Sequence, residues 1–252
     1  VVVDTSNGEI VGTSVHDYSM WKRGLFCDPA ANRFRQHPAD YLEGLERSVK
    51  GALQGLDPEI IRNIAGITVD TTGSTPVAVD RDGTPLSMKP GFENDPDAMF
   101  ILWKDHTAVR EAADINDLAR SWGGVDYTKY EGGVYSSEWF WSKVLHVMRT
   151  NEKVRQNAFS WVEHCDWISA LLTGNTDPLT LKRSRCAAGH KAMWSESFRG
   201  LPGETFLSRL DPLLSGLKER LYRDTYTCDV AAGKLTAIWA QKLGLPEGIS
   251  VG

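Results

Sequence analysis

The sequence predicts a single α/β or α+β domain, and three observations lead to this class. Short β-forming runs with glycine-containing turns occupy residues 1–13 and 76–86, and an apolar run covers residues 64–69 between them. Helical patterns then dominate the chain from residue 107 onward. Strands and hairpins followed by helices with short strands are typical of mixed helix and sheet domains. No low-complexity linker divides the 252 residues, so we treat them as one domain.

The chain begins with a predicted hairpin, which a predicted helix follows. Residues 1–4 and 9–13 flank Asn7-Gly8, a dipeptide that favours a tight hairpin turn. Residues 39–53 then have the spacing of an amphipathic helix, with Glu46 four residues before Lys50 on its surface. The residues that share its apolar face are Leu42, Leu45, Val49 and Leu53.

Two strand regions and four helices are predicted after this helix. We expect residues 64–69 to form a buried strand, and residues 76–80 and 84–86 to form a second hairpin. Thr107 is predicted to cap a helix that ends near residue 123, and Ser136 or Ser137 to cap the next one. Residues 161–173 and 236–243 are predicted helices that end at glycines. In the helix that Ser136 or Ser137 is predicted to cap, the residues predicted to share the buried face are Phe140, Val144, Val147 and Met148.

Composition excludes several classes of protein. A hydrophobic content of 41% and a charged content of 24% are ordinary for a globular domain, and no apolar run approaches the ~20 residues of a membrane span. The net charge of −5 argues against broad binding to nucleic acid or to an anionic membrane. Four scattered cysteines without a CxxC pair indicate neither structural zinc nor a disulfide framework, and we expect reduced thiols in the cytoplasm.

The most informative segment is residues 184–194, in which small residues stand beside one lysine and one tryptophan. Ala187, Ala188 and Gly189 leave room for a ligand near the backbone. Lys191 supplies a compact cation with three donors, and Trp194 supplies a flat apolar face along which the lysine stem can lie. This chemistry suits a polyhydroxylated ligand.

Two further segments have both a functional and a structural interpretation. In residues 70–75, Thr72 and Gly73 can line a pocket or can form an ordinary polar connection between strands. In residues 103–106, Trp103 and Asp105 can stack on a sugar and bind its hydroxyls. Alternatively, Trp103 closes the core, and Asp105 or Thr107 caps the following helix.

Other motifs are weaker or missing. Ser137 and Glu138 are explained by capping at a helix start, and a role in a pocket is secondary. The chain has no HxxxH or HxH pair, no GxSxG elbow, no Walker A loop and no Rossmann glycine fingerprint. We therefore predict no metal site.

Taken in order, these segments resemble the N-terminal, sugar-binding domain of the FGGY carbohydrate kinases and, within them, the L-ribulokinase group. The resemblance extends along essentially the whole chain, and its motifs lie in residues 66–76, 98–108, 135–141, 165–167 and 185–191. It implies a ribonuclease H-like domain of the actin-like ATPase type, with a mixed sheet flanked by helices. It also implies ATP-dependent phosphorylation of L-ribulose to L-ribulose 5-phosphate, as in arabinose catabolism, with ATP and Mg²⁺ as cofactors.

The resemblance assigns roles to seven residues. Gly73 would lie against the sugar, Lys191 would bind its hydroxyls or carbonyl, and Trp103 with Asp105 would shape the pocket. The remaining substrate-binding candidates are Thr72, Ser137 and Glu138.

The family pattern includes a first strand with a phosphate loop, which we expect before Val1, and a catalytic Asp, which we expect beyond Gly252. We therefore interpret residues 1–252 as part of a larger kinase, predict no catalytic residue among them, and expect ATP and Mg²⁺ to be bound mainly by other parts. Such a fragment is expected to be inactive alone.

Two alternatives remain open at this point. The chain could belong to an FGGY kinase that acts on another ketopentose or polyol, or it could be a non-catalytic sugar-binding module. The expected partners are L-ribulose or a related ketopentose and, for assembly, a second copy of the chain; nucleic acid and membranes are not expected.

Overall fold

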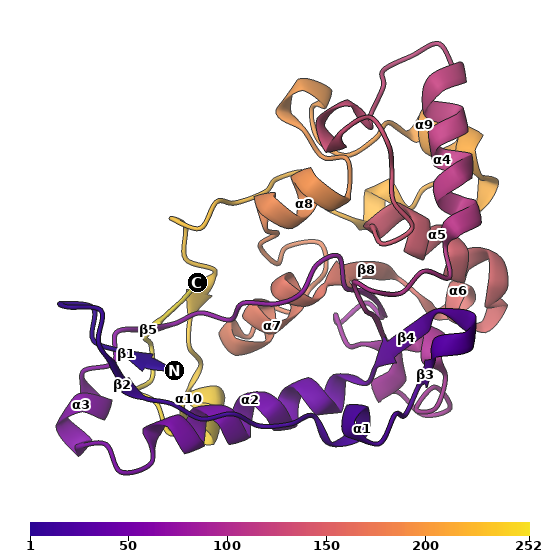
Figure 1. Ribbon diagram of the computed structural model, residues 1–252. Coiled ribbons are helices and arrows are strands. Elements are labelled where there is room, and N and C mark those ends of the chain that lie inside the picture. The colour runs from indigo at the N-terminus through magenta and orange to yellow at the C-terminus, as the bar shows by residue number, and fades with distance from the viewer.

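Short strands and helices alternate along the chain in the computed structural model, which describes residues 1–252 (Figure 1). The strands are β1 Val2–Val3, β2 Ile10–Gly12, β3 Cys27–Asp28, β4 Arg33–Gln36, β5 Gly66–Ile67, β6 Pro76–Val79, β7 Phe100–Ile101, β8 Ser160–Glu163, β9 Gly233–Lys234 and β10 Ser250–Val251. The helices are α1 Ser19–Lys22, α2 Pro38–Leu53, α3 Pro58–Arg62, α4 Val109–Ser121, α5 Phe140–Thr150, α6 Glu152–Asn157, α7 His164–Thr173, α8 Arg185–Lys191, α9 Glu204–Leu210 and α10 Ala237–Leu243. The predicted combination of helix and sheet is confirmed.

The strands form four small sheets. β1 and β2 make the predicted N-terminal hairpin, in which Gly8 adopts a φ of 78° in the turn. β10 lies parallel to β5 and antiparallel to β9, β4 lies between β3 and β7, and β6 pairs with β8. The sheet content is therefore mixed, and it is divided among separate short ladders.

The prediction of a second hairpin at residues 76–86 is wrong, because β6 pairs with a distant strand. Its antiparallel partner is β8, in register from Pro76 opposite Glu163 to Val79 opposite Ser160, and only a single bridge links Val79 to Pro85. All residues of both strands are buried, so this two-stranded sheet lies between two of the hydrophobic cores. Residues 160–163 are thus a strand, and the helix predicted to begin at residue 161 begins at His164.

The strand predicted at residues 64–69 is also shorter and more exposed than expected. Only Gly66 and Ile67 form β5, and neither is buried. β5 lies at the edge of its sheet and pairs with β10 alone, so one of its edges has no strand partner. Ile64, Ile67 and Val69 still pack partly against the core.

Most predicted helices are confirmed, although two of their caps are not. α2 places its predicted apolar face against the core and forms the Glu46–Lys50 ion pair at 2.7 Å. α4 begins after Ala108 rather than at Thr107, and α5 begins after Trp139 rather than at Ser136 or Ser137. Both α7 and α10 end at glycines with a φ of 75°. The predicted apolar face of α5 is buried in the largest core.

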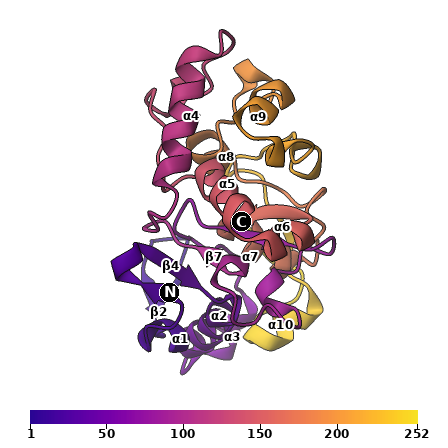
Figure 2. The same cartoon turned by 90° about the vertical axis from the view of Figure 1, so that its right-hand side faces the viewer.

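Three hydrophobic cores divide the molecule. The largest lies among α4, α5 and α9, which stand together in the upper half of Figure 2. Two smaller cores lie between α2, α7 and α10 and the adjoining strands in the lower half. The four cysteines are all free. None of the helices combines the length and the apolar character needed to cross a bilayer.

Candidate functional site

The predicted site residues lie on three loops and on the end of one helix. We call these loops the glycine loop (residues 70–75, between β5 and β6), the tryptophan loop (residues 102–107, after β7) and the serine loop (residues 135–139, before α5). Lys191 is the last residue of α8. Direct contacts connect the tryptophan loop to the serine loop and the serine loop to the end of α8, and Lys143 of α5 links the glycine loop to the tryptophan loop.

The glycine loop exposes its backbone at Gly73. A Cβ atom built on Gly73 would meet no atom within 4 Å, so a ligand could approach the main chain there. The hydroxyl oxygen of Thr72 lies 3.1 Å from that of Thr75. Below the loop, the carboxylate of Glu163 accepts hydrogen bonds from the Ser74 hydroxyl and, at 2.6 Å, from the Thr75 N–H. The loop is thus open on one side and anchored on the other.

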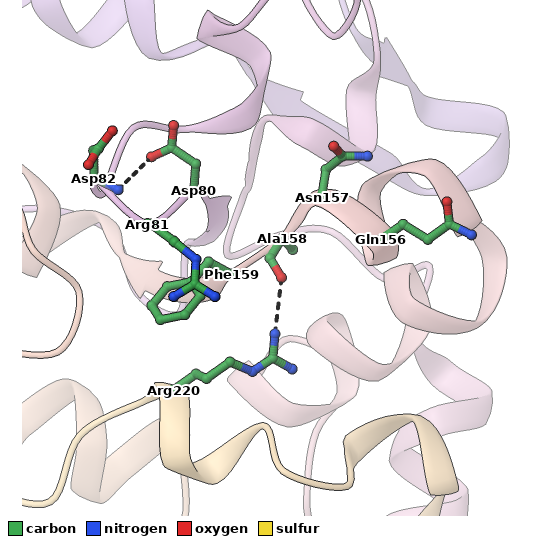
Figure 3. Close-up of a pocket in the computed structure, with 8 residues that line it drawn as sticks. All are labelled: Asp80, Arg81, Asp82, Gln156, Asn157, Ala158, Phe159 and Arg220. Atoms are coloured by element: carbon green, nitrogen blue, oxygen red, sulfur yellow. Dashed lines mark hydrogen bonds between the residues drawn. The ribbon is translucent and has the colours of Figure 1, made fainter.

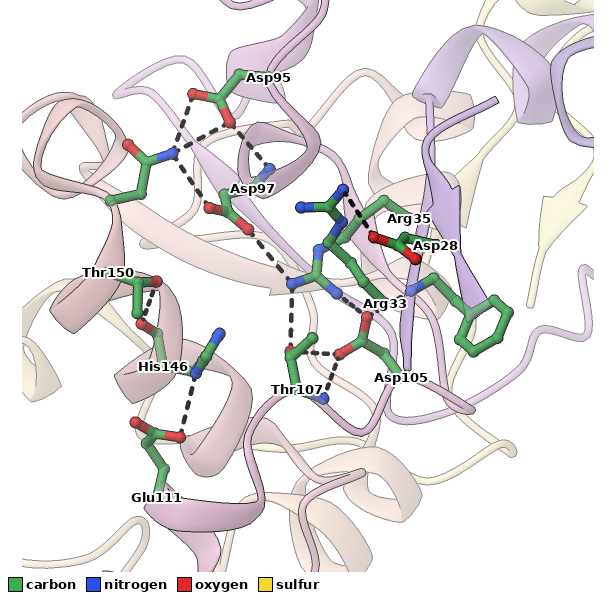
Figure 4. Close-up of polar contacts among 12 residues, drawn as sticks. Asp28, Arg33, Arg35, Asp95, Asp97, Asp105, Thr107, Glu111, His146 and Thr150 are labelled. Carbon is green, nitrogen blue, oxygen red and sulfur yellow. Dashed lines mark hydrogen bonds and ion pairs between the residues drawn. The ribbon is translucent and has the colours of Figure 1, made fainter. Parts of the chain in front are cut away.

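The tryptophan loop presents Trp103, whose exposed fraction is 46%, and hides Asp105, whose exposed fraction is 0%. The Asp105 carboxylate accepts hydrogen bonds from the Arg35 guanidinium, the Phe34 N–H at 2.6 Å, and the Thr107 hydroxyl and N–H (Figure 4). These contacts occupy both of its oxygens. Asp105 therefore fixes the shape of the loop, while a ligand could contact Trp103.

The serine loop contacts the tryptophan loop through His106. The Nδ1 atom of His106 lies 3.2 Å from the Ser137 hydroxyl, and its Nε2 atom lies 3.3 Å from a Glu138 carboxylate oxygen. The structure thus brings Ser137 and Glu138 next to the loop that carries Trp103. No pattern in the sequence indicated His106 as the residue that connects them.

The ammonium of Lys191 lies 5.2 Å from the centre of the Trp139 ring, and this geometry corrects the expected contact with Trp194. Trp194 instead lies under Arg185 and donates from its indole N–H to the Arg223 carbonyl at 2.9 Å. The reason is the turn after α8, where Met193 has a φ of 56° and redirects the chain before Trp194. A cation beside an aromatic face remains, with Trp139 as the ring.

Tyr135 and Glu131 fix the end of α8. The Tyr135 hydroxyl donates to the Lys191 carbonyl, and the Glu131 carboxylate accepts from the Met193 N–H at 2.8 Å. The other carboxylate oxygen of Glu131 is buried without a partner. Burial raises the pKa of Glu131 to about 8, opposed by the Met193 hydrogen bond and by the charge of Lys191. A single Glu before two glycines gave no signal of this role in the sequence.

A depression elsewhere on the surface, of about 400 Å³, contains none of the predicted site residues (Figure 3). Its two arginines are engaged locally, because Arg81 lies over Phe159 at 4.5 Å and Arg220 donates to the Ala158 carbonyl at 3.2 Å. We therefore place the candidate site at the three connected loops. Nowhere in the chain do three or more His, Cys, Asp or Glu side chains gather as metal ligands would.

Comparison with known proteins gives relatives along the whole chain, although no family model matches it. The chain is 50% identical over 251 residues to a ribulokinase of Vibrio parahaemolyticus, an alignment that covers 100% of this chain and 44% of the relative. It is 35% identical over 263 residues to a ribulokinase of Bacillus licheniformis, covering 100% of this chain and 45% of the relative. The chain thus spans less than half the length of these curated relatives.

Solved structures of sugar kinases share the fold. A xylulose kinase from Rhodospirillum rubrum superposes with a TM-score of 0.68 and 16% identity, covering 89% of this chain and 41% of that one. A xylulose kinase from Brucella ovis superposes with a TM-score of 0.64 and 19% identity, covering 90% and 41%. At these identities, the likeness establishes the fold, which is the actin-like ATPase fold of the FGGY sugar kinases.

Proposed function

The chain is homologous over its whole length to ribulokinases of the FGGY sugar kinases, and from this premise we propose that it is the sugar-binding part of an ATP-dependent L-ribulokinase. The observation that carries the proposal is the 50% identity with the Vibrio parahaemolyticus ribulokinase over 100% of this chain. Such an enzyme joins the terminal hydroxyl oxygen of L-ribulose to the γ-phosphorus of ATP. ADP departs, and the hydroxyl proton is released.

In this proposal, the exposed parts of the connected loops bind the sugar. Gly73 lets the sugar lie against the backbone, and the half-exposed Trp103 offers a face for the carbon skeleton. Lys191, beside Trp139, donates to hydroxyl or carbonyl oxygens. Thr72, Ser137 and Glu138 add polar groups at the margin, and Asp105 acts by holding the tryptophan loop in place.

ATP and Mg²⁺ belong to the proposal as the reactant and the metal that a kinase of this family uses. No cluster of ligating side chains in this chain fits Mg²⁺, so we assign none of its residues to the metal. The proposal also includes a location in the cytoplasm, where thiols remain reduced, and the four free cysteines agree with it. Arabinose catabolism as the pathway rests on the similarity to ribulokinases alone.

A chimera tests the activity directly. This chain would replace the corresponding segment of the Vibrio parahaemolyticus ribulokinase, and the ATP-dependent phosphorylation of L-ribulose, D-ribulose, D-xylulose and glycerol would be measured with the unaltered enzyme as control. We expect L-ribulose to have the highest kcat/KM.

Preference for another sugar would reassign the substrate within the same family. A folded chimera that binds L-ribulose but does not phosphorylate any of the four compounds would favour a non-catalytic module.

A further inference from the structure

Lys143 is a buried cation directly beneath the candidate site. It lies in the first turn of α5, where its N–H donates to the Trp139 carbonyl at 3.2 Å, and its exposed fraction is 1%. Its ammonium donates to the Ser74 carbonyl of the glycine loop at 2.7 Å and to the Leu102 carbonyl of the tryptophan loop at 2.8 Å. The Lys143 side chain therefore contacts the glycine loop and the tryptophan loop. Its helix, α5, begins directly after the serine loop.

The surroundings of Lys143 favour this arrangement over simple packing. Burying a lysine is costly, and a methionine could fill similar volume without that cost. Burial accordingly lowers the pKa of Lys143 to about 7, although Glu163 and Asp105 oppose the decrease. Glu163 holds Ser74 and Thr75 from the side of β8, so the glycine loop is fixed by a cation and an anion from two different elements.

We propose that Lys143 is a positioning residue of the sugar site, whose ammonium ties the glycine loop and the tryptophan loop to the first turn of α5. It thereby sets the spacing between Gly73, Trp103 and Trp139, the groups that face the ligand. This inference deepens the proposed function and rests on it. Lys143 itself does not contact the sugar.

The test compares Lys143→Met, Lys143→Arg and a matched control, Lys218→Met, in the chimera described above. Lys218 also donates to a backbone carbonyl, that of Leu201 at 3.1 Å, but in a region away from the three loops. Affinity for L-ribulose is measured by calorimetry, and backbone amide hydrogen exchange is measured segment by segment. Thermal unfolding verifies that each variant is folded at the temperature used.

Lys143→Met should lower the affinity for L-ribulose about tenfold or more, and should accelerate exchange in residues 70–75 and 102–107 while the core of α5 stays protected. Lys143→Arg should restore part of the affinity, because a guanidinium can still donate to two carbonyls. Lys218→Met should leave both quantities unchanged. A residue that only filled space would alter stability without this pattern.

Wild-type affinity and unchanged loop exchange in folded Lys143→Met would overturn the inference. If Lys143→Met does not fold, Lys143→Gln, which shortens the side chain and removes its charge, is measured in its place, and wild-type affinity with unchanged loop exchange there would also contradict the inference. If the unaltered chimera binds no pentulose, the proposed function fails, while the exchange pattern still decides whether Lys143 ties the loops.

Discussion

In the proposed function Lys191 supplies a cation to the sugar, since its ammonium lies beside the Trp139 ring and forms no ion pair. In the chimera described above, we expect Lys191→Met to raise the KM for L-ribulose about tenfold or more and to leave the KM for ATP unchanged. The methionine retains the apolar contact with Trp139 and removes the donors.

The matched control for Lys191 is Lys129→Met, since the Lys129 ammonium lies 5.3 Å from the centre of the Tyr130 ring, outside the site loops. Replacing an exposed lysine of this kind normally changes stability by less than ~0.5 kcal/mol. Equal kinetic constants for Lys191→Met and the unaltered chimera would remove Lys191 from the sugar site.

Glu131 predicts a dependence of stability on pH. Its pKa is raised from an ordinary value of 4.5 to about 8, so its favourable contribution is complete below pH 4.5 and is lost as the pH rises to about 8. Glu131→Gln keeps an acceptor for the Met193 N–H and removes the titration. The variant should therefore become more stable than the unaltered chain by about 1–3 kcal/mol at alkaline pH.

Urea unfolding between about pH 5 and pH 9 measures this difference, which should grow with pH and level off above about pH 8. Glu9→Gln, at an exposed residue of the N-terminal hairpin, should show no such trend. A pH-independent difference for Glu131→Gln would show that the carboxyl of Glu131 is not held neutral in the folded chain.

The sequence indicates the roles of single residues with unequal clarity, for a physical reason. Lys191 stood out as one lysine in a segment of small residues, and Gly73 allowed both a pocket and an ordinary connection, so their roles in sugar binding stay predictions. From the sequence alone, Asp105 could cap a helix or bind a ligand. Only the fold shows that its carboxylate is paired with Arg35. Lys143 gave no signal, since a lysine in an amphipathic helix is normally exposed.

At the scale of elements, local patterns predicted the ends of several helices well, left α1, α3, α6, α8 and α9 unpredicted, and predicted strand partners poorly. Helical spacing and terminal glycines are local features, and α2, α7 and α10 end where their sequences predict. The turn at residues 81–83 predicted a local hairpin. Instead β6 pairs with β8, whose residues are about eighty positions away in the sequence, because both strands are buried together in the core.

A comparison of Gly73 with Gly83 can distinguish a glycine needed for ligand contact from a glycine needed for the backbone conformation. Gly73 has open space around its Cβ position, whereas a Cβ on Gly83 would lie 1.8 Å from the Thr176 carbonyl oxygen, at a φ of 75°. We expect Gly73→Val to weaken L-ribulose binding about tenfold or more with little change in melting temperature. Gly83→Val should instead destabilise the fold by about 2 kcal/mol or more.

Calorimetry and thermal unfolding of both glycine variants give the comparison. A large loss of stability in Gly73→Val would mean that the backbone, rather than the ligand, requires glycine there. Unchanged affinity in a stable Gly73→Val would place the sugar elsewhere.

At the scale of the whole molecule, the order of the motifs along the chain, which resembles that of the FGGY kinases, predicted the fold class, and the binding of a sugar by the segments that carry these motifs stays a prediction. The sequence could not indicate that the strands would divide into four small sheets or that the helical half would hold the largest core. Those features depend on contacts distant in sequence, which no local pattern reports.

The last prediction concerns the 252-residue polypeptide made by itself. It spans 44% of the length of the Vibrio parahaemolyticus ribulokinase, and the superposed xylulose kinases are covered to 41%. Phosphoryl transfer needs nucleotide, metal and acceptor held in line, and closure of a site around the substrate excludes water. We therefore expect the polypeptide to bind L-ribulose weakly and not to phosphorylate it, whereas the chimera does both. Calorimetry and a coupled assay for ADP, run on both proteins at equal concentration, make the comparison. Phosphorylation by the polypeptide alone would mean that residues assigned above to binding and packing perform the chemistry.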